Sequence, residues 1–230
     1  MFDKNILKAT ISEISFYENR LYPFQDEIFR LIQTDRFYLS GGTCLSRFYY
    51  HHRYSEDLGF FFDGYLYSKE EFEIVFREII NRISENFKTE IAVEGEYFKR
   101  GFIYKEDTIL RIEFIYENYK NVGDSKCVDG IRIDSKENIA TNKLTAVYDR
   151  KTAKDFIDLY YLLQEIDFEQ AAKWAEYKVV SLDYEGMLIA FADHKLEGTV
   201  LLKQDISLRE LNDFVTNLIR RMMDYAKKHR

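Results

Sequence analysis

The stretch "FYLSGGTCLSRFYYHHRYSEDLGFFFD" at residues 37–63 begins with residues that could bind a phosphate. A short apolar run ends at Gly41-Gly42-Thr43, and a helix-compatible segment follows. Such a turn exposes backbone N–H groups at a positive helix end, glycine lets a phosphate approach closely, and the threonine hydroxyl can donate another hydrogen bond. An ordinary tight turn can have the same sequence, so the triplet alone leaves both readings open.

The same stretch ends with half of a metal-binding pair. Residues i and i+2 of a strand share a face about 6.6 Å apart, so Asp-x-Asp can hold two Mg²⁺ ions for in-line attack on a phosphate. Here Asp57 is followed by Gly59, Glu56 falls on the opposite face, and Asp63 lies too far along the strand. A single aspartate at the start of a strand can equally be a cap or turn residue.

A third acid, Glu113, interrupts the apolar segment "TILRIEFIY". If Ile112 and Phe114 face the core, then Arg111, Glu113 and Ile115 share the other face. A carboxylate in the middle of a strand is costly unless it is exposed or bound to something. Glu113 is therefore either a third carboxylate of the site or a surface acid on an edge strand.

Paired charges recur in "NKLTAVYDRKTAKDFIDLYYL" at residues 142–162. Lys143 and Arg150 are seven apart, two helical turns on one face, and Asp155 and Asp158 are three apart. The basic residues could reach phosphates, while the acids could orient them or act as a base. A solvated pair of helices with salt bridges is the structural alternative.

These residues depend on two predicted regions. Residues 1–135 alternate between helix and strand, which predicts an α/β or α+β sheet domain. The expected helices are 10–33 (broken or kinked at Pro23), 43–52 and 68–87, and the expected strands are 37–40, 58–62, "IAVEGEYF", "GFIYK", "TILRIEFIY" and "VDGIRIDS". Residues 136–230 predict a helical domain, with two helices over 136–164 and three more in "FEQAAKWAEYK", "YEGMLIAFADHKL" and "SLRELNDFVTNLIRRMMDYAKK".

The composition excludes several classes of protein. The 230 residues are 46% hydrophobic and 17% aromatic, which excludes a disordered chain, and a net charge of -7 argues against bulk coating of nucleic acid. Cys44 and Cys127 form no CxxC or Cys/His cluster, so we expect neither a disulfide framework nor structural zinc. No run of about 18 apolar residues occurs, so we expect no membrane span and a cytoplasmic protein.

Taken together, the two motifs resemble the AbiEii/AbiGii toxin family, nucleotidyltransferase-like proteins of bacterial abortive-infection and toxin–antitoxin systems. The family pattern is Gly-Gly-Ser/Thr, a spacer, a Ser-x-Asp-Leu-Asp-Phe-Phe strand, then Lys-Leu-x-Ala…Arg…Lys-Asp-x-x-Asp-Leu. The resemblance covers about residues 37–165, and the spacer at 44–56 has a length typical of the family. The departure is Gly59, where the family has an aspartate.

The resemblance implies a DNA-polymerase-β-like nucleotidyltransferase domain, a mixed sheet with flanking helices, followed by a C-terminal helical domain. It also implies Mg²⁺, a nucleoside triphosphate between the domains, an RNA acceptor such as tRNA, and a cognate antitoxin. Asp158 would hold two helices together, and Asp155 would position Lys143 or assist deprotonation. The implied nucleotide-binding residues are Gly41, Gly42, Thr43, Lys143 and Arg150, the metal ligands Asp57 and Glu113, and the catalytic residues Asp57, Glu113, Lys143 and Asp155.

Gly59 leaves several functions open. The leading hypothesis is a nucleotidyltransferase toxin whose activity is impaired by this glycine. One alternative is a degenerate protein that binds nucleotide, RNA or antitoxin without turnover, and another is a nucleotidyltransferase that modifies a small molecule or a protein. Gly59 itself is compatible with natural decay, a single-metal variant or deliberate inactivation.

Overall fold

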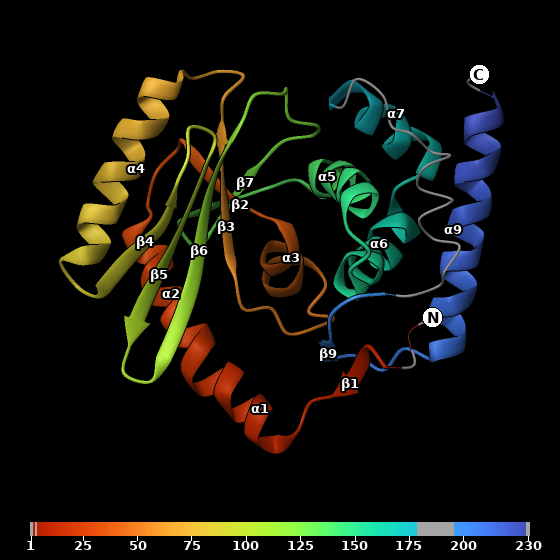
Figure 1. The fold of residues 1–230 in the computed structure, drawn as a ribbon, viewed down its shortest axis with the longest axis horizontal. Helices are drawn as coiled ribbons and strands as arrows, with labels where there is room; N and C mark the ends of the chain where they lie inside the picture. The colour runs from red at the N-terminus through yellow and green to blue at the C-terminus, as the bar shows by residue number, and fades with distance from the viewer. Residues whose placement is uncertain (1, 3, 179–195, 229–230) are drawn as a thin grey trace. The chain divides into compact units, whose positions relative to one another are not determined.

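The computed structural model describes residues 2, 4–178 and 196–228 (Figure 1). The chain divides into two units, each made of separate chain segments. The sheet unit is Ala9–Phe48 with Ser55–Ser135, and the helical unit is Met1–Lys8, Tyr49–Tyr54 and Lys136–Arg230. The chain passes from the sheet unit to the helical unit after Ser135, and the short segments 1–8 and 49–54 also group with the helices.

The sheet unit contains a mixed sheet of seven strands in the order β4-β5-β6-β3-β2-β8-β7. β3 pairs antiparallel with β2 and parallel with β6, so it lies within the sheet, away from both edges. This arrangement confirms the predicted fold class, a mixed sheet with flanking helices. The strands are β2 (Phe37–Ser40), β3 (Leu58–Asp63), β4 (Lys88–Glu94), β5 (Phe98–Lys105), β6 (Thr108–Glu117), β7 (Lys126–Val128) and β8 (Ile131–Ile133).

Two strand predictions cross a turn. The segment "VDGIRIDS" begins at Val128, the last residue of β7, and continues through a turn into β8. "IAVEGEYF" spans the end of β4 and the turn into β5, where the Gly95 N–H donates to the Phe98 carbonyl at 2.9 Å. The alternating pattern continues through this turn, so periodicity alone could not find the reversal.

The predicted helix over residues 10–33 is a continuous helical segment whose hydrogen bonding changes in the middle. It consists of α1 (Ile11–Phe16), a π-helical turn η1 (Tyr17–Leu21) and α2 (Tyr22–Leu31). Pro23 has no N–H and its ring would collide with the preceding turn of an α-helix. The wider π turn lies directly before the proline, which fits the expected disturbance without a break in the helix.

Aromatic side chains fill the core of the sheet unit. Helix α4 (Lys69–Ser84) begins at Ser68 with a capping box completed by Glu71, and it packs Phe76 against Phe114 of β6 with ring centroids 5.2 Å apart. Figure 1 shows α2 and α4 beside the same sheet. Ile112 and Phe114 are fully buried, which confirms that Arg111, Glu113 and Ile115 occupy the opposite face.

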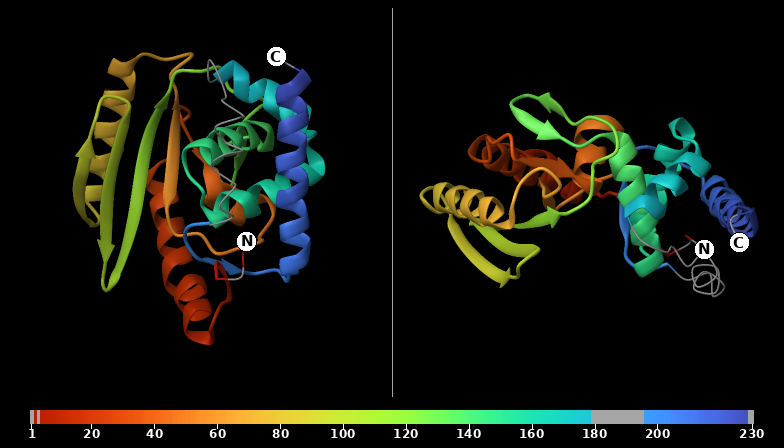
Figure 2. Two further views of the ribbon diagram at one scale, coloured as in Figure 1. Left: turned by 45° about the vertical axis from the view of Figure 1, so that its right-hand side comes forward. Right: turned by 90° about the horizontal axis from the view of Figure 1, so that it is seen from above.

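The helical unit contains α5 (Lys136–Asp149), α6 (Ala153–Glu165), α7 (Phe168–Lys178) and α9 (Leu208–Lys228). A short parallel pair, β1 (Ile6–Lys8) with β9 (Val200–Leu202), joins its distant segments. Within this unit α9 runs beside α6 (Figure 2). Tyr160 of α6 packs on Phe214 of α9 with ring centroids 5.4 Å apart. The predicted helix "YEGMLIAFADHKL" lies, apart from its last residue, outside the described residues. In the described ranges no helix has the length and apolar character needed to cross a bilayer.

Candidate active site

The glycine turn leads from β2 into a short helix, α3 (Gly41–Cys44), which continues as a π-helical turn η2 (Leu45–Tyr49). Gly41 has a φ of 72°, a conformation that favours glycine. Thr43 is buried, and its hydroxyl shares a 2.8 Å hydrogen bond with the Ser55 hydroxyl and donates to the main-chain carbonyl of Asp57. The threonine hydroxyl thus holds the segment that carries Asp57.

Asp57 immediately precedes β3 and belongs to a row of alternating charges across the exposed face of the sheet. The Asp57 carboxylate pairs with the Arg111 guanidinium, and Arg100 Nε donates to Glu113 Oε1 at 2.9 Å. Arg111 Nε lies 3.8 Å from the same Glu113 oxygen, so one guanidinium stands between the two carboxylates. We call Asp57, Arg111, Glu113 and Arg100 the charge ladder. Their side chains are 33%, 38%, 23% and 37% exposed, so solvent reaches all four.

Gly59 lies beside this ladder, where a family member would carry its second aspartate. Its Cα partners are Ser40 on β2 and Glu113 on β6. A Cβ added here would meet a Phe61 ring carbon at 3.7 Å and the Ser40 carbonyl oxygen at 3.9 Å, both ordinary contacts. The local space would therefore admit a Cβ at position 59.

Asp57 and Glu113 are the two carboxylates of this ladder, and each is paired with an arginine. Asp57 and Glu113 flank a single cationic group, and carboxylate oxygens are the ligands that Mg²⁺ prefers. Among the described residues no cluster of three His, Cys, Asp or Glu side chains could hold a metal. Because the two guanidiniums of the ladder balance its two carboxylates, an ion at Asp57 would have to replace Arg111.

Helix α2 fixes the backbone that leads into Asp57. The Tyr22 hydroxyl accepts a 3.3 Å hydrogen bond from the Ser55 N–H, and Gln25 Nε2 donates to the Glu56 carbonyl at 2.8 Å. The Glu56 carboxylate accepts from the Tyr17 hydroxyl on η1, so Glu56 and Asp57 have different partners on different elements. Burial, together with Glu56, raises the pKa of Tyr17. One sign of this role for Gln25 was present in the sequence, namely a polar residue on the apolar stripe of a helix, and the role was not predicted.

In the helical unit, the predicted basic and acidic residues form a tight cluster. Lys143 Nζ lies 2.6 Å from Asp155 Oδ1 and 2.6 Å from Asp158 Oδ2, and all three residues are buried. Arg150 Nε donates to Asp155 Oδ2 at 2.9 Å. The Arg150 side chain is 52% exposed against 7% for Lys143, so Arg150 is the cation of this group that an anion can reach.

Two further residues complete the cluster. Arg53 Nε and His52 Nε2 each lie 2.7 Å from Asp158 Oδ1. We call His52, Arg53, Lys143, Asp155 and Asp158 the buried cluster. The sequence contained both residues in "HHRYSED", but nothing in it pointed to Asp158, more than a hundred residues further along.

Electrostatics fixes the protonation states of the buried cluster. Burial alone would raise the pKa of Asp158, but Arg53 and Lys143 hold it well below the ordinary value. The pKa of Asp155 is also lowered, because Lys143 and Arg150 outweigh its burial. Burial lowers the pKa of His52 despite the carboxylate beside it, so the ring is neutral at pH 7. Its Nε2 then donates to Asp158, and Nδ1 has no hydrogen-bond partner among the residues that the structure describes.

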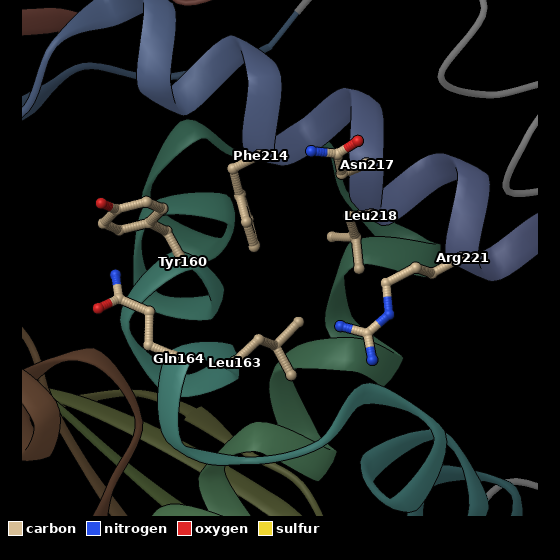
Figure 3. Close-up of a pocket in the computed structure, with 7 residues that line it drawn as sticks. All are labelled: Tyr160, Leu163, Gln164, Phe214, Asn217, Leu218 and Arg221. Atoms are coloured by element: carbon tan, nitrogen blue, oxygen red, sulfur yellow. The ribbon is translucent and has the colours of Figure 1, made fainter.

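The predicted site residues thus form two groups. Asp57, Glu113 and the turn Gly41–Thr43 lie in the sheet unit, and Lys143, Arg150 and Asp155 lie in the helical unit. A separate pocket of about 130 Å³ between α6 and α9 includes none of them (Figure 3). Its lining residues are Tyr160, Leu163, Gln164, Phe214, Asn217, Leu218 and Arg221.

Comparison with known proteins places these features in a family. The profile of the nucleotidyl transferase AbiEii toxin family, of type IV toxin–antitoxin systems, matches residues 25–228. Two similar solved structures are JHP933 from Helicobacter pylori (22% identity, 91% of this chain and 95% of that one, TM-score 0.57) and MenT4, a nucleotidyltransferase toxin from Mycobacterium tuberculosis H37Rv (15% identity, 89% and 83%, TM-score 0.60). At these identities the likeness shows a shared fold. No curated protein sequence gives a significant match.

Proposed function

Because this chain belongs to the AbiEii family of nucleotidyltransferase toxins, we propose that it transfers a nucleotide from a nucleoside triphosphate to an RNA acceptor such as tRNA, with a rate lowered by Gly59. The observation that carries this proposal is the placement of Asp57 and Glu113 around one cationic position, beside Gly59. The site keeps two of its acids and has room for the third.

In this proposal the sheet unit binds and orients the triphosphate. Backbone N–H groups of Gly41, Gly42 and Thr43 bind phosphate oxygens, and the Thr43 hydroxyl keeps Asp57 in position. Asp57 and Glu113 are the residues that would hold Mg²⁺. When bound, such an ion stabilises charge on the transferring phosphate and orients it. With glycine at position 59 the site lacks the second carboxylate of the family pattern, and we attribute the proposed lower rate to this loss.

The helical unit has a phosphate-binding candidate of its own, Arg150. A guanidinium matches phosphate oxygens in geometry, and that of Arg150 is half exposed. Lys143 Nζ lies 2.6 Å from Asp155 Oδ1, and the lowered pKa of Asp155 makes that carboxylate a weak base. We therefore assign Asp155 to positioning Lys143 and Arg150 rather than to deprotonating the acceptor.

The family name also supports a protein partner. AbiEii toxins belong to toxin–antitoxin systems, and we propose a cognate antitoxin for this chain. A second candidate function is nucleotide or antitoxin binding without turnover, which the balanced charge of the ladder favours because it opposes cation binding.

The proposal can be tested by restoring the missing acid. Gly59→Asp and the native chain are incubated with Mg²⁺ and each of the four labelled NTPs, in the presence of total tRNA, protein and small-molecule acceptors. We expect the variant to label RNA at least about a hundredfold faster, since a metal stabilises the developing charge by several kcal/mol. Gly59→Asn is the matched control, because it has nearly the same shape without the charge.

Three other results would redirect the assignment. Label in a small acceptor or in protein would move the chain to a different substrate class. Binding of an NTP without any label, in a folded Gly59→Asp variant, would support the binding function. If none of the four NTPs binds and none gives label, the assigned site is wrong.

A further inference from the structure

The charge ladder contains its own competitor for a metal ion. We propose that the Arg111 guanidinium is a resident counter-ion of Asp57, that a divalent cation must displace it, and that the displaced guanidinium then binds the phosphates of the nucleotide. Metal and nucleotide binding would consequently reinforce one another. This inference rests on the proposed function, because it concerns the same site.

The position of Arg111 supports competition. Its terminal nitrogen pairs with the Asp57 carboxylate, while its Nε lies 3.8 Å from Glu113, so the guanidinium occupies the place between the two proposed metal ligands. The Nε is buried without a hydrogen-bond partner among the described residues. Arg111 is therefore held chiefly through one end of its planar group, and its hydrogen bonding is incomplete.

The charge balance explains why the competition matters in this chain. The ladder holds two carboxylates and two guanidiniums. An aspartate at position 59 would give three carboxylates, so a cation could be held while Arg111 kept a partner. With Gly59, a cation at Asp57 leaves Arg111 without its carboxylate, and the energy of that pair opposes metal binding.

The neighbourhood gives the displaced side chain an acceptor. Asp57 is tied to the glycine turn through the bond from Thr43, so the ladder begins next to the proposed phosphate-binding N–H groups. Arg111 is 38% exposed and arginine forms forked hydrogen bonds with phosphate. Arg100 differs, since its partner is Glu113 on the neighbouring strand.

The first measurement is Mn²⁺ binding without nucleotide, followed by electron paramagnetic resonance, which needs no enzyme activity. Arg111→Gln should bind Mn²⁺ more tightly than the native chain by roughly threefold to tenfold, the effect of removing a competing, partly exposed ion pair. Arg111→Lys, which keeps the charge, should stay near the native value. Arg100→Gln is the matched control on the other carboxylate and should have a smaller effect.

The second measurement is the affinity for each of the four NTPs by calorimetry. In EDTA, Arg111 stays on Asp57, so native and Arg111→Gln chains should bind alike. With Mn²⁺ the native chain should bind the preferred NTP more tightly than Arg111→Gln, because only the native chain has a guanidinium to release. A merely structural role for Arg111 would not raise Mn²⁺ affinity and lower NTP affinity in the same variant.

The outcomes separate the inference from the function. If native and Arg111→Gln chains bind Mn²⁺ equally well, and Asp57→Asn weakens binding in both, then Arg111 does not compete with the metal ion. The proposed metal site would remain in place. Mn²⁺ affinity unaffected by Asp57→Asn in every background would remove the proposed metal site, and the inference with it. Circular dichroism of each variant establishes folding, and Arg111→Lys supplies a second variant if Arg111→Gln does not fold.

Discussion

The charge ladder and the buried cluster are built from almost the same residue types, yet they differ in solvent exposure. The ladder side chains are 23% to 38% exposed, whereas Asp155 and Asp158 are fully buried. Exposed ion pairs contribute little to stability and can exchange partners. A buried charge that loses its partner costs several kcal/mol, so the buried cluster has one stable arrangement. Exposure therefore separates charges that can change partners on binding from charges that hold a fold.

The largest expected effect comes from opening the buried cluster. Asp158→Ala leaves Arg53 and Lys143 buried with too few carboxylates and should destabilise the helical unit by about 3–5 kcal/mol. Urea unfolding followed by fluorescence of Trp174, the single tryptophan, reports on this unit because Trp174 lies on α7. A loss below about 1 kcal/mol would mean that water solvates the cluster, and the contrast with the ladder would disappear.

A smaller loss of stability is expected from removing the buried Thr43 hydroxyl, which holds the segment that carries Asp57. Thr43→Val removes the hydroxyl that bonds Ser55 and the Asp57 carbonyl, and unpaired buried groups cost about 1–3 kcal/mol. Thermal unfolding of the sheet unit measures the loss, and Thr43→Ser should retain most of the stability. If Val and Ser variants unfold alike, the hydroxyl does not hold the segment.

The buried cluster should also respond to pH. The ordinary pKa of histidine is 6.5, and burial lowers the pKa of His52. Below pH 6.5 the unfolded chain therefore binds a proton at His52 more readily than the folded chain does. Stability should therefore fall as the pH drops below 6.5, by at most about 1.4 kcal/mol per pH unit. Asp155 and Asp158 of the buried cluster also have lowered pKa values, so stability should fall a second time below pH 3.8.

Unfolding midpoints between pH 5 and 8 test the first of these windows. His52→Gln should flatten the curve between pH 5 and 7, and His51→Gln is the matched control because that neighbouring ring is exposed. An unchanged slope in His52→Gln would assign the pH dependence to another group.

The smallest expected effect is in the ladder itself. Arg100→Ala breaks a partly exposed pair with Glu113 and should change the free energy of unfolding by less than about 1 kcal/mol. Denaturation under the conditions used for Asp158→Ala allows direct comparison. A cost of several kcal/mol would show that the ladder, too, is fixed.

Local patterns carried much of the prediction. The alternation in "TILRIEFIY" correctly assigned the two faces of β6, and the glycine turn was expected where α3 begins. Pairings between distant segments could not be read in this way. Arg111 meets Asp57 because β3 and β6 are neighbours in register, and His52 meets Asp158 across more than a hundred residues. Likewise, the three-residue strands β1, β7 and β9 are too short to show any periodicity.

The passage of residues 49–54 through the helical unit has a consequence for protein synthesis. His52 and Arg53 leave the ribosome long before Asp158. Their bonds to Asp158 can therefore form only after α6 has been translated. Domains generally fold as units during synthesis, yet this one has to recruit a segment inserted between two strands of the other unit. A fragment starting at Lys136 would bury Asp158 without His52 and Arg53. A nascent chain ending near residue 135 would contain His52 and Arg53 but not the carboxylate of Asp158. Completion of the helical unit is therefore a late event, which delays a fully assembled enzyme until most of the chain has been made.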